Sequence, residues 1–236
     1  MAFLISVLDV VLSSIFATLV LREWWRKRKP YQLLWGGALL IWAVAVFAEM
    51  VAAYQGMWSP FTYRVYYAFG ALMVAAWLGA GSLFLVLPRR GAMAALAFVL
   101  LLSLAGGVLV FTWPIDPSGL TRTDVLGFVE TKMFPFIPVR VLIVMANIFG
   151  TVAFVGSALY SVWLFSRRQM ERERMVGVAL IALGGIVAAS AHSIGVLGGL
   201  ALFRVSELMA ISLIFAGYLV GSLPLRRKVS RKVAVA

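Results

Sequence analysis

The chain has 236 residues, of which 63% are hydrophobic and 13% are charged, about half the charged fraction of a soluble domain. This composition excludes an ordinary water-soluble protein, and the absence of cysteine excludes disulfides, thiolate nucleophiles and cysteine-ligated metals. A formal net charge of +12 would indicate a nucleic-acid partner in a soluble protein, but in a membrane protein the placement of the cations matters more than their sum.

Seven stretches of the sequence are long and apolar enough to cross a bilayer as helices, which takes about 20 mostly apolar residues. They are apolar on all sides, which excludes the alternating strands of a membrane β-barrel. The stretches are Phe3–Leu21, Tyr31–Tyr54, Tyr63–Leu87, Ala92–Trp113, Val139–Phe165, Met175–Leu197 and Phe203–Leu223. The sequence therefore predicts an all-α integral membrane protein, with one seven-helix transmembrane domain over residues 1–225 and a basic tail at 226–236.

Basic residues gather on one side of this arrangement. They follow the first, third and fifth spans and fill the tail: Arg22, Arg26, Lys27, Arg28, Lys29, Arg89, Arg90, Arg167, Arg168, Arg172, Arg174, Arg226, Arg227, Lys228, Arg231 and Lys232. The positive-inside rule assigns that side to the cytoplasm and the N-terminus to the outside. We therefore expect a multi-pass protein of the cell membrane, with its basic loops against anionic lipid headgroups and no nucleic-acid partner.

The longest connection runs from Pro114 to Pro138 and carries the signals of a helix of its own. Thr121 and Asp124 resemble a capping box, and apolar residues recur after them at helical spacing. We predict a short amphipathic helix on the outer membrane surface between the fourth and fifth spans. Its simplest role is to bridge these spans, and the alternative is a lid over an outward-facing cavity.

The first three and the last three spans share the same order of orientations, in residues 1–90 and 138–228. The third span of each set also ends alike, on Gly81-Ser82-Leu83 and on Gly221-Ser222-Leu223. A parallel repeat of three spans on either side of a linking span is a known transporter layout, with the binding site between the halves. Such a likeness of span ends also arises by chance, so the repeat is one of two interpretations.

Small residues recur at small-xxx-small spacing within the predicted spans. Ala75 with Gly79 and Gly184 with Ala188 are examples. This spacing lets helix backbones approach closely. We expect ordinary bundle contacts there, and the alternative is a set of contacts that move in a transporter.

Ionisable side chains within spans are the first candidates for function, since each one costs roughly 2.5–3.5 kcal/mol on insertion scales. At a rise of 1.5 Å per residue, Asp9, Glu49, His192 and Glu207 lie about 6–9 Å from the outer ends of their spans, and Arg140 and Arg204 lie near the outer ends. The inner two thirds hold none, which argues against a charged relay across the membrane. The candidate ligand-binding residues of this outer layer are Asp9, Glu49, Tyr54, Arg140, Asn147, His192, Arg204 and Glu207.

Each candidate also has a purely structural interpretation. Arg204 and Glu207 are three residues apart and can pair on one helix face. The carboxylates of the first two spans can pair with Arg140 between helices. His192 can be an interhelical hydrogen-bonding residue rather than a ligand or proton carrier, and Tyr54 can belong to the aromatic belt at the outer membrane surface.

No pattern in the sequence points to an enzyme, a metal or a cofactor. The last span has no lysine for retinal, and one histidine is too few for a dihaem cytochrome. The H-E-x-x-H, G-x-S-x-G, Walker A and G-x-G-x-x-G patterns do not occur. We therefore expect no catalytic residue.

The favoured hypothesis for function is an outward-facing polar pocket that binds a small ligand or ion in a transporter or channel. The first alternative is a receptor or sensor that signals through a partner. The second is an accessory subunit of a larger membrane complex. A homo-oligomer or another membrane protein is a possible partner under all of these hypotheses.

Overall fold

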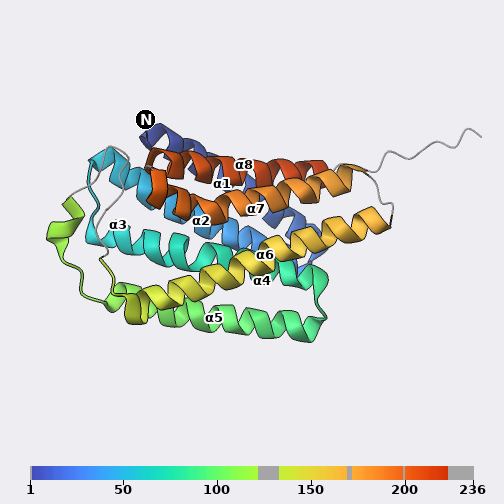
Figure 1. Cartoon of the computed structure of the whole chain (residues 1–236), viewed down its shortest axis with the longest axis horizontal. Helices are drawn as coiled ribbons and strands as arrows, with labels where there is room; N and C mark the ends of the chain where they lie inside the picture. Colours follow the sequence, from blue (N-terminus) through green and yellow to red (C-terminus); the bar gives the residue numbers. More distant parts are fainter. Residues whose placement is uncertain (1, 122–132, 169–171, 199, 223–236) are drawn as a thin grey trace, which may run out of the picture.

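The computed structural model describes residues 2–121, 133–168, 172–198 and 200–222, without the side chains of residues 2, 119, 121 and 192–202. Every regular element in these ranges is helical, and the long helices lie side by side in one bundle (Figure 1). The elements are α1 (Ala2–Lys27), α2 (Pro30–Gln55), α3 (Pro60–Val65), η1 (Tyr66–Met73), α4 (Val74–Val86), α5 (Arg89–Thr112), η2 (Pro117–Thr121), η3 (Phe136–Arg140), α6 (Val141–Arg167), α7 (Arg172–Gly198) and α8 (Leu200–Ser222).

The described chain contains seven helical stretches that are long and apolar enough to cross a membrane. They are Phe3–Lys27, Pro30–Gln55, Pro60–Val86, Arg89–Thr112, Phe136–Arg167, Arg172–Ala191 and Phe203–Ser222. Each coincides with a predicted span, which confirms the helical fold and identifies a multi-pass membrane protein. The amphipathic helix predicted after Thr121 falls mainly on residues 122–132, outside the described residues. The repeat of 1–90 with 138–228 stays a prediction.

The first span is longer than hydropathy alone predicted, because α1 continues through charged residues to Lys27. Lys27 Nζ pairs with Glu23 Oε1 one turn earlier, and the cations of the last turn complement the helix dipole. Arg28 then takes a left-handed backbone conformation at φ 53°, and Pro30 begins α2. We call the end of the bundle that carries this turn the basic end, and the opposite end, where α1 begins, the N-terminal end (Figure 1).

The third span is built from three helical segments of different geometry. Ser59 and Thr62 form a capping box at the start of α3, with Thr62 N donating to Ser59 Oγ at 3.1 Å. The segment η1 is a wider π-helix, in which the N–H of Val74 bonds the carbonyl of Phe69 five residues earlier. Asn147 of α6 donates to the carbonyl of Ala71 within it, at 2.6 Å. Such π-helical turns occur frequently at functional sites.

Glycines bring two pairs of helices into direct backbone contact. A Cβ on Gly150 of α6 would lie 2.2 Å from the carbonyl carbon of Ala75 in α4, and a Cβ on Gly79 would lie 2.9 Å from Gly150 Cα. A Cβ on Gly184 of α7 would lie 2.8 Å from the carbonyl oxygen of Ala210 in α8. The expected close packing at Ala75, Gly79 and Gly184 is therefore confirmed.

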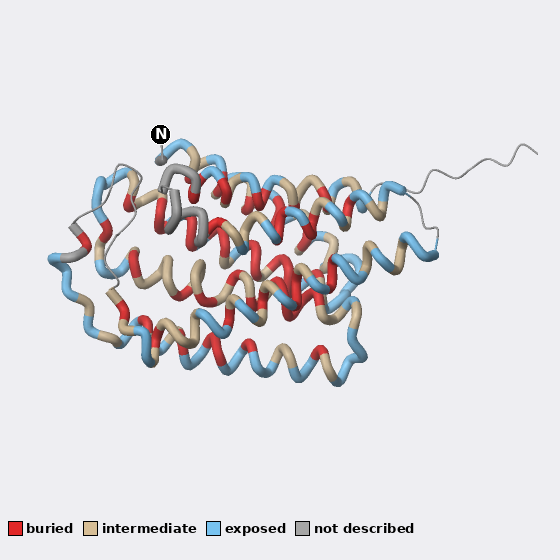
Figure 2. The backbone as a smooth tube through the Cα atoms, in the orientation of Figure 1, coloured by how far each residue is buried: buried red, intermediate tan, exposed pale blue. Residues whose placement is uncertain are grey.

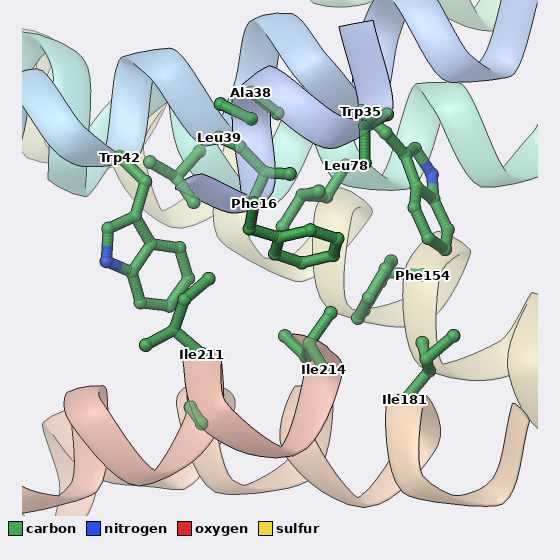
Figure 3. Close-up of a cluster of buried hydrophobic side chains, with 14 of the residues drawn as sticks. Phe16, Trp35, Ala38, Leu39, Trp42, Leu78, Phe154, Ile181, Ile211 and Ile214 are labelled. Carbon is green, nitrogen blue, oxygen red and sulfur yellow. The ribbon is translucent and has the colours of Figure 1, made fainter. Parts of the chain in front are cut away.

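The main hydrophobic core occupies the middle of the bundle and extends toward the basic end. Its large side chains come from α1, α2, α4, α6, α7 and α8 and point toward one another (Figure 3). They include Phe16, Trp35, Leu39, Leu78, Phe154, Ile181 and Ile214. Exposed residues lie mainly on the outward faces of the helices (Figure 2), where large apolar side chains such as Leu101 and Val152 are exposed as lipid contact requires.

Candidate ligand-binding site

Four ionisable side chains from three helices come together in the half of the bundle nearer the N-terminal end. Arg204 of α8 forms a salt bridge with Glu49 of α2, through Nη1 and Oε2, and the two side chains are only 2% and 1% exposed. Arg204 also interacts electrostatically with Asp9 of α1 and Glu207 of α8. A single guanidinium therefore faces three carboxyl groups. We call Asp9, Glu49, Arg204 and Glu207 the charged cluster.

Asp9 is held in this cluster by a tryptophan that the sequence analysis did not single out. The Trp42 indole Nε1 donates to Asp9 Oδ1 at 3.1 Å, and both residues are buried. A buried indole N–H needs an acceptor, which is the one signal in the sequence that points to Trp42. The bond joins α1 to α2 and fixes the plane of the indole ring.

A cavity of about 100 Å³ lies between α2, η1, α4, α6, α7 and α8. We call it the central cavity, because its lining residues lie near the middle of their helices. Its aromatic and polar lining residues are Trp42, Tyr66, Asn147, Thr151, Phe154 and Glu207. Much of the remaining lining is glycine and alanine, including Gly70, Gly150 and Gly185. A Cβ added at Gly70, Gly150 or Gly185 would lie 3.0 Å or less from an atom of a neighbouring helix, so these glycines let the lining helices pack closely.

A second cavity, of about 220 Å³, lies nearer the N-terminal end. Tyr63, Tyr66 and Tyr67 line it together with Arg140 and the Glu49–Arg204 pair, and we call it the tyrosine cavity. The rings of Tyr63 and Tyr67 pack with centroids 4.6 Å apart. Tyr66 borders both cavities and is their shared wall.

The structure brings most of the predicted site residues together. Asp9, Glu49, Arg204 and Glu207 form the charged cluster, Asn147 lines the central cavity, and Arg140 lines the tyrosine cavity. Arg204 forms its salt bridge with Glu49 of another helix. The sequence spacing had indicated Glu207, three residues away on the same helix, as its partner.

Two predicted site residues stay apart from this arrangement. Tyr54 is 78% exposed and its ring packs against Phe3, with centroids 5.8 Å apart. That position agrees with its alternative interpretation as part of an aromatic belt. The side chain of His192 lies outside the described part of the structure.

The expectation that the inner two thirds of the spans hold no ionisable group needs a correction at the basic end of α1 and α8. Because α1 extends past Leu21, Glu23 stays on the span helix and accepts a hydrogen bond from Tyr218 Oη of α8 at 2.5 Å. Phe16 connects this pair to the core, since its ring lies 4.9 Å from that of Phe215 and 5.2 Å from that of Tyr218. A continuous line of contacts therefore joins α1 and α8 from the core to the basic end.

The described residues hold no group of three or more histidine, cysteine, aspartate or glutamate side chains placed to bind a metal ion. The linings of the two cavities combine charged, hydrogen-bonding and aromatic side chains. Comparisons with protein-family models, with curated proteins and with solved structures find no match to the chain.

Proposed function

We propose that the protein transports a small solute, which binds in the central cavity beside Glu207. The observation that carries this proposal is a cavity near the middle of the bundle with a buried charged cluster at its edge. Transporters bind their substrates near the bilayer midplane between packed helices. Ionisable groups inside a membrane are costly, and a role in binding accounts for them.

The proposed path begins at the N-terminal end. The distribution of basic residues favours the outside for this end and the cytoplasm for the basic end. The tyrosine cavity then lies on the outer side of the central cavity, with Tyr66 between them. Arg140 and the Glu49–Arg204 pair would be the first charged groups that an entering solute meets.

The packed core favours a transporter over an open channel. Leu78 and Ile214, which line the central cavity, pack in the same hydrophobic core as the buried Phe16 and Leu39, so passage of a solute toward the basic end would need a rearrangement of helices. Such a rearrangement needs little side-chain repacking where helices touch through glycine. The π-helical segment η1 beside the cavity is a second place where the helix can adjust.

A receptor is the second candidate, and the contacts between α1 and α8 favour it. A ligand that displaced Arg204 or Asp9 would move these helices, and the Phe16, Tyr218 and Glu23 contacts would carry the movement to the basic end. A partner protein would then bind one of the two conformations at the basic end in preference to the other. The transport measurement below separates the two functions, because a receptor binds the solute without passing it. An accessory subunit would do neither.

Glu207→Gln is expected to abolish solute uptake. Purified protein in liposomes would be tested with radiolabelled choline, glycine betaine, alanine, acetate and glucose, one at a time. At least one solute should enter faster than in protein-free liposomes, and Glu207→Gln should slow it by more than tenfold, since the carboxylate borders the cavity. Glu173→Gln, at an exposed position in the first turn of α7, is the matched control and should transport normally. Entry of all five solutes at the protein-free rate would contradict the proposal.

A further inference from the structure

Glu207 is the member of the charged cluster that lines the central cavity, whereas Glu49 and Arg204 line the tyrosine cavity together with a second cation, Arg140. Asp9, Glu49 and Glu207 supply three carboxyl groups, and Arg204 is the one cation among them. Glu49 Oε1 and Arg204 Nε are both buried without a hydrogen-bond partner among the described residues, although Glu49 Oε2 faces Arg204 Nη1. An uncompensated carboxylate is expensive in a low-dielectric interior. A cation in the central cavity would supply Glu207 with a counter-charge there.

The lining of the central cavity adds a second, independent preference for a cation. Trp42, Tyr66 and Phe154 line the cavity together with Glu207. Aromatic faces attract ammonium groups through their negative quadrupole, and the attraction is strongest when water is excluded. Trp42 is already oriented by its hydrogen bond to Asp9, so its ring does not have to be ordered when a ligand binds.

The size of the central cavity limits the group that it can take. A cavity of 150 Å³ holds a benzene molecule, and the central cavity measures about 100 Å³. It therefore matches a head group of about four or five heavy atoms. The tyrosine cavity beyond Tyr66 leaves room for the rest of the molecule. Short alkyl-substituted ammonium heads meet both limits.

We propose that the central cavity binds a small organic cation, with its ammonium head against Glu207 and among the rings of Trp42, Tyr66 and Phe154. This inference rests on the proposed function, because it names the class of the transported solute. The charged cluster behind the cavity acts as a fixed counter-charge. Arg204 neutralises part of the negative charge of the cluster. Its salt bridge with Glu49 also connects α8 to α2.

The test compares choline with 3,3-dimethylbutan-1-ol, which has nearly the same shape but carries carbon in place of the charged nitrogen. Purified full-length protein in detergent would be titrated with each, and both the midpoint of thermal unfolding and tryptophan fluorescence would be followed. Choline should give a saturable rise in the midpoint, because it binds only the folded protein. The neutral alcohol should bind at least tenfold more weakly.

Two variants locate the choline site. Glu207→Gln and Tyr66→Leu should each weaken choline binding at least tenfold, whereas Glu173→Gln should leave it unchanged. The comparison of choline with its neutral analogue uses the unmodified protein, so it remains decisive if a variant fails to fold. Equal affinity for choline and the alcohol would overturn the proposal, as would the absence of a saturable choline effect.

The remaining probes separate this inference from the proposed function. Glycine betaine has the same ammonium head with an added carboxylate, and acetate has only the carboxylate. Binding of betaine no tighter than that of choline supports the cation site. If acetate or alanine binds in a Glu207-dependent way and choline does not, the proposal of an organic cation is wrong, but the proposal of a transporter still stands. If no probe binds and none is taken up, both proposals fail.

Discussion

Replacing Arg204 by methionine is expected to destabilise the folded protein by about 3–5 kcal/mol, because the substitution removes one partner of a buried ion pair. Glu49, which is 1% exposed, would lose its only salt-bridge partner among the described residues, and Asp9 and Glu207 would lose the nearby positive charge. Thermal unfolding in detergent, followed by circular dichroism, should show a midpoint lower by roughly 10 °C or more.

The control is Arg90→Met, which removes an arginine at an exposed position near the start of α5. It should change the midpoint little, since exposed charges contribute little to stability. The double variant Arg204→Met with Glu49→Gln should recover part of the loss, because it no longer buries that carboxylate without a partner. An Arg204→Met protein with the unfolding midpoint of the unmodified chain would show that the salt bridge does not hold the cluster together.

Gly150→Ala is expected to destabilise the protein by about 2–3 kcal/mol, the upper part of the range for an overpacked core. The added Cβ would lie 2.2 Å from the carbonyl carbon and 2.4 Å from the carbonyl oxygen of Ala75. Backbone atoms cannot rotate out of the way, so α4 and α6 would have to separate. The variant should also weaken solute binding, because Gly150 and Ala75 both border the central cavity.

Gly156→Ala is the matched control for this substitution. Gly156 lies on the same helix, and a Cβ there would meet no atom within 4 Å. Alanine is a better helix former than glycine by about 0.8–1.0 kcal/mol, so this variant should be at least as stable as the unmodified protein. Equal unfolding midpoints for the two variants would contradict the backbone contact between α4 and α6.

The spans could be predicted from the sequence because a bilayer imposes a length of apolar residues on every crossing helix. The ends of the helices could not. Hydropathy places the end of the first span before Arg22, but α1 continues to Lys27 because the Glu23–Lys27 pair and the helix dipole stabilise its last turn. This continuation is what brings Glu23 to Tyr218.

The depth of the site residues in the membrane could be predicted from the sequence, but the directions in which their side chains point could not. Counting residues from the span ends placed Asp9, Glu49 and Glu207 in one layer, and the structure brings them to one cluster. The same counting included Tyr54, which is 78% exposed. Residue counts give the height of a side chain in the membrane, whereas the packing of neighbouring helices determines which way it points.

The central cavity itself was the least predictable feature. Its lining comes from six helical elements, α2, η1, α4, α6, α7 and α8, and no single stretch of sequence carries that information. The pairing of Trp42 with Asp9 was equally hidden, since it depends on the rotation of α1 against α2. The polar residues indicated a site, and the packing of the helices determines its shape.

The most direct test of the account is the accessibility of the central cavity to water, and the absence of cysteine from the chain makes the measurement simple. Thr151 lines the cavity, whereas its neighbour Val152 is 69% exposed on the outer face of α6. Each would be replaced by cysteine and treated, in intact cells, with a cationic methanethiosulfonate reagent that does not cross membranes. Only a thiol in water forms the reactive thiolate readily. The account predicts that Thr151→Cys reacts and Val152→Cys does not; a reactive Val152→Cys beside an inert Thr151→Cys would contradict it.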